Sequence, residues 1–178
     1  MKAFLTGVAF IILLTFFNTF QIEQDAYIRA QEYIKVMCDD MAGAAILFVD
    51  EGAFSQGKKV YEKTISQQTV KNLVMANMDL KSNLSPNESS YWNTSIDYTT
   101  YYFDDTGYMS VYKNGLFSSQ ENFAYGSVFT DPETEYKKLI TEATVIVTLK
   151  TDYPVYKAHW MNWPEIVRSS AYEDLDRN

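Results

Sequence analysis

The sequence predicts an α+β protein in which one long N-terminal helix packs, through its second half, on a small and mostly antiparallel β-sheet. Three observations predict this fold. A charge-free run covers residues 3–22, an apolar stripe at seven-residue spacing continues from it, and β-branched and aromatic segments separated by turns come after the stripe. We therefore divide the chain into residues 1–22, residues 23–50 as an extension of the same helix, and residues 51–178 as a head.

The charge-free run from Ala3 to Ile22 is 20 residues long. As a helix it measures about 30 Å, the thickness of one hydrocarbon core, so the sequence predicts a transmembrane signal anchor with the bilayer as its partner. A cleaved signal peptide would have a shorter apolar core and small residues at its cleavage site. Here the run ends in Phe16-Phe17-Asn18-Thr19-Phe20. A cleaved signal and a soluble core helix remain the alternatives.

The charges on either side of the run predict its orientation. Lys2 precedes it, and Glu23 and Asp25 follow it. The positive-inside rule then places the N-terminus in the cytoplasm and the head outside, in a single-pass protein of the cytoplasmic membrane. Beyond residue 22 the chain carries 14 basic and 23 acidic residues. We expect so acidic a head to be repelled by anionic lipid and to stand off the membrane.

The helix is expected to continue past the membrane to about residue 49. No proline occurs before Pro86, and Gly52 is placed to follow the last helical turn. Apolar residues recur at seven-residue spacing, which gives the outer half of the helix one apolar face. These residues are Phe20, Tyr27, Ile34, Met41 and Phe48.

Two roles are predicted along this apolar stripe. A β-sheet needs an apolar partner for its inner face, so the head should pack on the distal residues Met37, Met41, Ala44 and Phe48. We expect the residues nearer the membrane to be out of reach of a head attached beyond residue 50. We therefore hypothesise a subunit interface at Tyr27, Ala30 and Ile34. The alternative, that the whole outer half packs on its own head, remains open.

The head is predicted to contain two short helices and several strands. Residues 66–78 have helical spacing with Ser66 as N-cap, and Asp131-Pro132 is a good start for a helix to about residue 140. Strands are expected at residues 96–103, 108–112 and 143–150, with turns at 104–107 and 113–115. Pro154 and Pro164 interrupt the chain beyond the last of these strands, and the tail from residue 173 is expected to fray.

Composition argues against several kinds of chemistry. A net charge of −8 disfavours nucleic-acid binding, and one Cys with one His excludes a disulfide within the chain and a Cys/His zinc site. Asp105-Thr106-Gly107 matches the aspartic-protease tripeptide, but no second copy exists and a hairpin turn explains it. No motif places a nucleophile beside His159, and Cys38 lies in the apolar stripe. We expect no catalytic residues, no metal and no cofactor.

Residues 91–129 hold 12 aromatic residues among 39. The segment 99–115 resembles one unit of the choline- or glucan-binding repeats of bacterial surface proteins, with matches at Tyr101, Tyr102, Phe103, Asp104, Gly107 and Met109. Those repeats bind between consecutive copies, and this chain has one copy. The resemblance makes Tyr101, Tyr102, Phe103 and Tyr108 possible ligand-binding aromatics, against the simpler interpretation of an aromatic hairpin.

The overall plan, a membrane helix that runs unbroken into an amphipathic half and then a β-rich head, resembles type IV pilins. Within that group it is most similar to the minor pilin-like (TadE-like) membrane proteins of tight-adherence loci. The processing motif differs, because the glycine available is Gly7 and the fifth residue after it is Ile12 instead of Glu. The resemblance implies a structural or accessory subunit of a surface appendage or secretion apparatus, with other pilin-like subunits or assembly-platform proteins as partners. A surface-anchored module that binds glycan or protein through residues 91–129 is the alternative.

Overall fold

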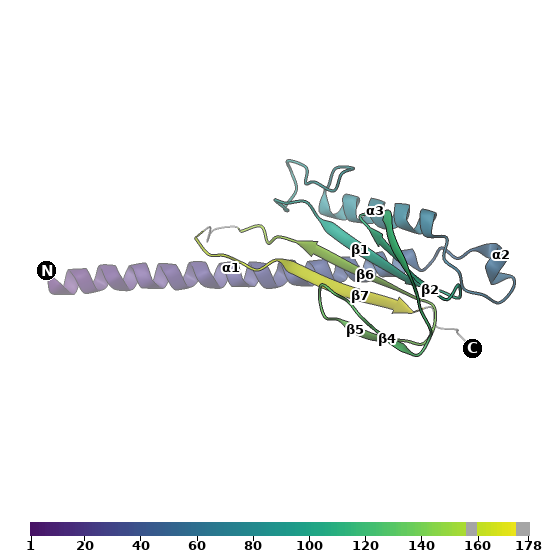
Figure 1. Ribbon diagram of the computed structural model, residues 1–178. Coiled ribbons are helices and arrows are strands. Elements are labelled where there is room, and N and C mark those ends of the chain that lie inside the picture. The colour runs from purple at the N-terminus through teal and green to yellow at the C-terminus, as the bar shows by residue number, and fades with distance from the viewer. Residues whose placement is uncertain (156–159, 174–178) are drawn as a thin grey trace.

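The computed structural model describes residues 1–155 and 160–173, and it confirms the predicted α+β class (Figure 1). Helix α1 (Lys2–Ala45) extends far beyond the head, and the head packs along its second half. The other elements are α2 (Glu51–Phe54), α3 (Lys63–Met78), β1 (Asp97–Phe103), β2 (Tyr108–Lys113), β3 (Leu116–Asn122), β4 (Ser127–Thr130), β5 (Lys137–Ile140), β6 (Thr144–Thr151) and β7 (Ile166–Glu173).

Five strands form one antiparallel sheet in the order β3-β2-β1-β6-β7, and β4 pairs with β5 in a separate two-stranded sheet. Strand β1 is central, with Tyr101 opposite Val111 of β2 and opposite Ile146 of β6. The predicted strands at 96–103, 108–112 and 143–150 are β1, β2 and β6, each within one residue at either end.

The sheet is apolar on both faces, because alternate side chains of β1 and β6 enter two separate cores. Tyr98, Tyr102 and Val147 face α1 and α3 in the larger core. Tyr101, Phe103 and Ile146 face the opposite way, where Phe129 of β4 and Ile140 of β5 cover them. The head is therefore three layers: two helices, the five-stranded sheet and the small β4–β5 ribbon.

Helix α1 ends at Ala45, four residues earlier than predicted, and Gly52 lies inside α2 instead of after the long helix. The cause is a competing set of local bonds. The Asp50 carboxylate accepts from the Ala53 amide at 2.6 Å and caps α2. Val49 pairs as a β-bridge with Tyr61, and the Asp50 amide donates to the Val60 carbonyl at 2.7 Å. These bonds draw the chain off the helix axis.

The predicted helix at 66–78 exists as α3, but it begins at Lys63, and Ser66 is not its N-cap. Ser66 is fully buried within the first turn and donates to the Ala45 carbonyl at 2.9 Å. Its hydroxyl also bonds the phenol of Tyr102 in the sheet. Ser66 therefore ties α3 both to the end of α1 and to β1.

The turn at 113–115 is confirmed as a two-residue hairpin loop between β2 and β3. Asn114 and Gly115 both have positive φ, 52° and 83°, as a type I′ turn requires. The Asn114 side chain also accepts from the Tyr98 amide at 2.9 Å, which fastens the turn to the start of β1.

The predicted helix from Asp131 to residue 140 is wrong, since residues 137–140 form strand β5. Asp131 does cap the local backbone by accepting from the Glu133 amide at 2.8 Å. Its second carboxylate oxygen accepts from Thr148 and Ser169 in the main sheet. This anchorage holds Asp131 fully buried and turns the chain back, so the β4–β5 ribbon forms where a helix was expected.

Strand β7 was not predicted from the sequence. It is an edge strand that pairs with all of β6, and its Ile166 is fully buried against the larger core. The segment IVRSSAYE has only weak alternation and follows Pro164, so local pattern gave no clear strand signal. The expected frayed tail lies outside the described residues beyond Glu173.

Candidate functional site

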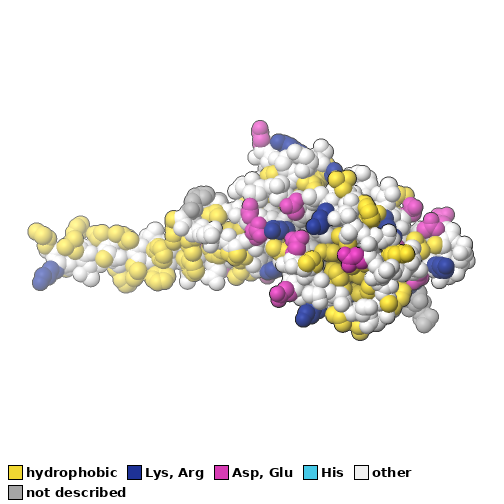
Figure 2. Space-filling view, viewed as in Figure 1, with side chains coloured by type: hydrophobic (Ala, Val, Ile, Leu, Met, Phe, Trp, Pro, Cys, Tyr) yellow, Lys and Arg dark blue, Asp and Glu magenta, His cyan; other side chains and the backbone are white. Residues whose placement is uncertain are grey.

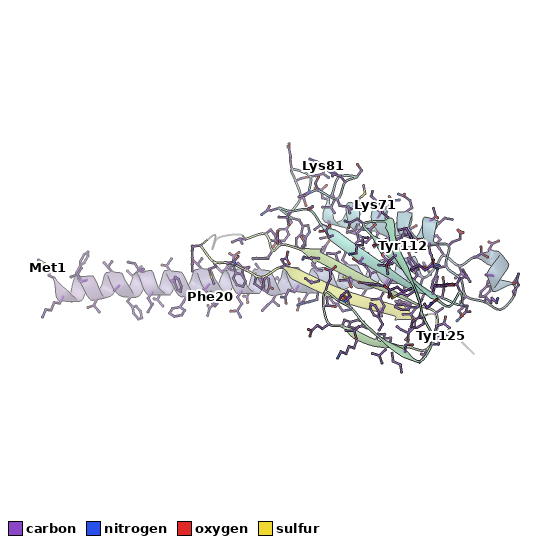
Figure 3. The ribbon with its side chains drawn as sticks, in the orientation of Figure 1. Met1, Phe20, Lys71, Lys81, Tyr112 and Tyr125 are labelled. Carbon is purple, nitrogen blue, oxygen red and sulfur yellow. The ribbon has the colours of Figure 1, made fainter. Side chains whose placement is uncertain are left out.

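The first 18 residues of the chain are all exposed, and α1 carries them away from the body of the head (Figure 3). An 18-residue window of α1 has a mean hydropathy of 2.0 with no residue buried, so this stretch is a candidate membrane span. Thr6, Thr15 and Thr19 each donate to the carbonyl four residues earlier, at 2.9–3.0 Å, as expected for hydroxyls in an apolar setting. Figure 2 shows apolar side chains along this stretch and charged ones gathered over the head.

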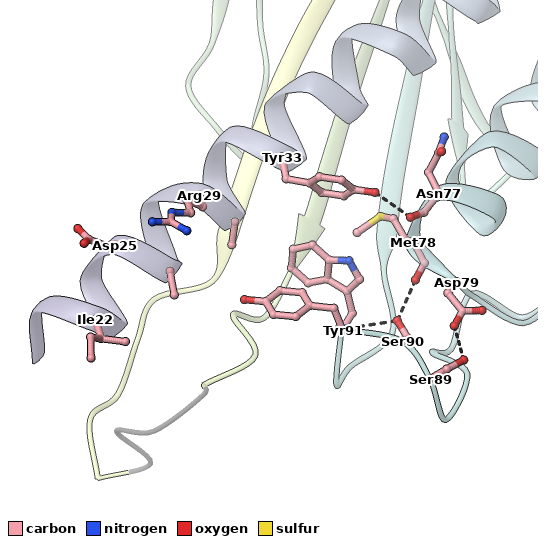
Figure 4. Close-up of a pocket in the computed structure, with 13 residues that line it drawn as sticks. Ile22, Asp25, Arg29, Tyr33, Asn77, Met78, Asp79, Ser89, Ser90 and Tyr91 are labelled. Carbon is pink, nitrogen blue, oxygen red and sulfur yellow. Dashed lines mark hydrogen bonds between the residues drawn. The ribbon is translucent and has the colours of Figure 1, made fainter. Parts of the chain in front are cut away.

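A groove of about 700 Å³ opens at the base of the head, where α1 leaves the bare stretch (Figure 4). One wall is a stripe of α1, and the other comes from the end of α3 and the loop before β1. Asp25 and Arg29 are the charged residues that α1 contributes. The groove is otherwise mostly apolar, with Ile22, Ala26, Ala30, Tyr33, Met78, Tyr91 and Trp92 in its lining.

Two hydrogen bonds hold the groove walls in place. Tyr33 of α1 donates to the Asn77 carbonyl at the end of α3, at 2.7 Å. Ser90 donates to the Met78 carbonyl at 2.8 Å and so keeps the loop with Tyr91 against α3. Burial raises the pKa of the Tyr33 phenol, and burial together with the Glu23 carboxylate raises the pKa of Tyr91. Both phenols are therefore neutral at physiological pH, and Tyr33 remains a hydrogen-bond donor.

An aromatic seam lies on another side of α1 at the same level. Trp163 packs on Tyr27 with ring centroids 5.0 Å apart, and Tyr153 meets both rings. Within this seam Glu23 is fully buried, and its carboxylate accepts from the Tyr153 phenol at 3.0 Å. The pKa of Tyr153 is raised, first by burial and then by the Glu23 carboxylate, which keeps the phenol a donor.

The structure corrects the hypothesised subunit interface at Tyr27, Ala30 and Ile34. Ile34 is fully buried in the larger core of its own chain and Ala30 is 5% exposed. Tyr27 is half-buried by Tyr153 and Trp163. The prediction failed because it assumed that the head begins where the chain leaves the helix. The loop after α3 and the segment before β7 instead return along α1 and cover this part of it.

The predicted helix–head packing residues divide into two pairs. Met37 and Met41 lie in the larger core with 3% exposure or less. Ala44 and Phe48 are only half-buried, and Phe48 lies beyond the end of α1. The packing surface on α1 is therefore centred about one helical turn or more nearer the N-terminus than predicted.

Three of the four possible ligand-binding aromatics belong to the protein core. Tyr102 and Phe103 are fully buried, and Tyr101 is 5% exposed. Tyr102 accepts from Gln67 at 2.8 Å and bonds Ser66, so its polar end is engaged as well. Only Tyr108 of the four is on the surface. The resemblance to a glycan-binding repeat does not carry over to an aromatic surface here.

The carboxylates of the 104–107 turn serve the fold. Asp104 is buried and forms an ion pair with Lys63 at 2.7 Å. Asp105 accepts from the Lys59 amide at 2.7 Å and from the Tyr125 phenol at 2.8 Å. Together they fasten the β1–β2 turn to the segment before α3, so this pair is not arranged to share a proton across a cleft.

Cys38 is fully buried, and its thiol donates to the Arg168 carbonyl of β7. Burial raises the pKa of this thiol to about 12, which keeps it protonated and unreactive. His159 lies outside the described residues. Among the residues that are described, no three His, Cys, Asp or Glu side chains gather as a metal site would need.

Sequence reasoning missed the residues that shape the base of the head: Glu23, Tyr91, Trp92, Tyr153, Trp160 and Trp163. Their shared signal is that aromatic residues far apart in sequence meet one stretch of α1, which no local pattern reports. No family model matches the chain, and the comparisons with curated proteins and with solved structures found no match either.

Proposed function

We propose that the chain is a membrane-anchored, pilin-like subunit, structural or accessory, of a surface appendage or secretion apparatus. The observation that carries this proposal is the division of one unbroken helix. Residues 3–18 of α1 are exposed, free of charge and mostly apolar, whereas the buried residues of 30–45 form the centre of the head's core. A head built directly on its own anchor transmits force and orientation without a flexible linker, which suits a subunit of an assembly.

The partner in this proposal is the apolar helix of a neighbouring subunit, seated in the groove at the base of the head. The α1 wall of the groove, from Ile22 to Tyr33, is continuous with the bare stretch. A neighbouring helix could therefore lie along both without a break. Ala26, which is only partly buried in the groove lining, leaves room for close approach of a second backbone. This location replaces the interface hypothesised at Tyr27, Ala30 and Ile34.

Photo-cross-linking in membranes tests the proposal. A photoreactive phenylalanine at Ile22, which is exposed in the groove, should give adducts with the α1 segment of a pilin-like subunit. The matched controls are Ile28 and Val36, which are at least as exposed on α1 but lie outside the groove. Equal adducts from groove and control positions, or none from either, would reject a pilin-like packing at this site.

Topology is the second test, and it addresses the proposed orientation. Protease added to cells stripped of their wall should degrade the head and leave the bare stretch protected. An intact head would place it in the cytoplasm and would contradict an extracytoplasmic role. A mature chain that begins near Gln21 would show that the apolar stretch is a cleaved signal.

A further inference from the structure

The described residues that lead into β7 reach farther along α1 toward the N-terminus than the strands of the head do (Figure 1). Its Trp160 stacks on Phe16, with ring centroids 5.0 Å apart and planes 27° apart. Phe16 lies inside the charge-free run, and Trp160 is 58% exposed. A residue from the C-terminal part of the chain thus lies beside the candidate membrane span.

The position of Phe16 sets the depth of Trp160. Phe16 precedes Ile22, the end of the charge-free run, by six residues, which is about 9 Å along a helix. If the run spans the hydrocarbon core, a ring stacked on Phe16 lies below the headgroups of the leaflet nearest the head. The exposed face of Trp160 is then turned toward lipid.

The length of the bare stretch also indicates that the edge of the head lies below the lipid headgroups. Residues 2–18 measure about 26 Å as a helix, less than the roughly 30 Å of a typical hydrocarbon core. Apart from the contact of Trp160 with Phe16, the head begins to cover α1 at Thr19 and Phe20. A span of the usual thickness therefore requires the membrane-proximal edge of the head to enter the leaflet by a few ångströms.

The chemistry of this edge suits the interface between headgroups and acyl chains. Residues 160–164, Trp-Met-Asn-Trp-Pro, carry no charge in an otherwise acidic chain. Indole and phenol rings prefer this interface, because one end is apolar and the other can reach water. Trp163 lies over Phe20 and Tyr27, and it forms part of the seam that encloses the buried Glu23. The edge thereby separates that carboxylate from lipid.

We propose that Trp160 is a second membrane contact, inserted beside α1 into the leaflet nearest the head. The inference rests on the proposed anchorage of α1 in the bilayer. It differs from the expectation that the acidic head stands off the membrane, since an uncharged aromatic edge brings the head down onto it. The surface that Trp160 contacts is lipid, not a second protein chain.

Fluorescence quenching by brominated lipid tests this contact, because the chain has only three tryptophans. Full-length protein is reconstituted in phosphatidylcholine vesicles brominated near the top of the acyl chains. One variant keeps Trp160 alone, through Trp92→Phe and Trp163→Phe. Its matched control keeps Trp92 alone, which is buried in the head beside Tyr33, far along α1 from Phe16. A third variant carries Phe10→Trp with the three natural tryptophans changed to Phe.

The proposal predicts that brominated lipid quenches Trp160 and leaves Trp92 unquenched. The Phe10→Trp variant reports whether α1 is inserted. Quenching at position 10 without quenching of Trp160 would overturn the second contact and leave the membrane anchor standing. No quenching at either position would overturn both. A further outcome is Trp160 fluorescence that is unaffected by brominated lipid yet changes with the protein-to-lipid ratio. That result would assign the exposed face of Trp160 to a neighbouring chain and would also overturn the proposal.

Discussion

Two stretches of α1 solve different packing problems within one continuous helix. The bare stretch at residues 2–18 is crowded with large side chains, among them Phe4, Phe10 and Phe17, all at least half exposed. The covered stretch at residues 30–45 places small residues at its buried positions between larger ones. Its buried residues are Ala30, Ile34, Met37, Cys38, Met41, Ala42 and Ala45, with 5% exposure or less.

The difference reflects the surroundings of each stretch. The space between α1 and the sheet has a fixed shape and must be filled at the density of a protein interior. Small residues are therefore needed on α1 where β6 and β7 approach it, with larger residues between them. Lipid is fluid and has no fixed shape, so the bare stretch needs only apolar surface of sufficient length. Side-chain size therefore distinguishes the buried face of the covered stretch from the bare stretch. Substitutions in each stretch test how independent the two are.

The largest effect is expected for Ile34→Asp in the covered stretch. It places an unpaired carboxylate in the larger core, which should lower the free energy of unfolding by more than about 4 kcal/mol. The control is Val36→Asp, two residues on and 57% exposed, which should change stability by less than about 0.5 kcal/mol. Denaturant unfolding of the full-length chain in detergent measures both. Similar losses for the two variants would show that the head does not cover Ile34.

In the bare stretch a charged substitution should weaken membrane insertion and leave the stability of the head unchanged. Ile12→Arg places a charge near the centre of the candidate span, at a cost of about 3 kcal/mol of insertion free energy. Carbonate extraction of membranes should release more of this variant than of the natural chain. Denaturant unfolding of its head should be unaltered, because Ile12 is 65% exposed and lies outside both cores of the head. A destabilised head would mean that the two stretches unfold together.

Alkaline pH should weaken the covered stretch through Cys38. The pKa of its thiol is raised from the usual 9.0 to about 12 by burial, so between these pH values the folded chain keeps a proton that the unfolded chain loses. The free energy of unfolding should then fall with rising pH by about 1.4 kcal/mol for each pH unit from this group. Cys38→Ala should show a shallower fall between pH 9 and pH 12. Parallel curves would indicate that the thiol is accessible to water.

The smallest effect is expected when each of the two glycines of α1 is changed to alanine. Changing Gly43 to Ala should raise the free energy of unfolding by about 1 kcal/mol, from helix propensity and from contact with the Tyr172 ring 3.6 Å away. Gly7→Ala gains the same propensity but meets nothing within 4 Å, and its stretch does not unfold with the head. Head stability should therefore change in the first variant alone. A higher free energy of unfolding in both variants would show that the two stretches unfold as one cooperative unit.

Local sequence patterns predicted the elements whose formation depends on nearby residues. The charge-free run, the helix at 66–78, the strand at 143–150 and the Asn114-Gly115 turn all follow from periodicity, propensity or positive φ within a few positions. Patterns also predicted that α1 would carry an apolar face into the head. Where two local signals competed, as at Asp50 and Asp131, the sequence could not say which would win.

The sequence by itself determined that α1 exists, that its first part is bare of charge and that an antiparallel sheet follows. Only the tertiary structure decided which surfaces are covered. Ile34 is buried, Cys38 bonds Arg168, and Glu23 accepts from Tyr153, across 130 positions in each of these last two contacts. Such contacts depend on where the chain returns after the sheet has formed. An apolar stripe on a helix predicts that some part of the protein covers it. It does not predict which distant segment does so, because the hydrophobic effect is non-directional.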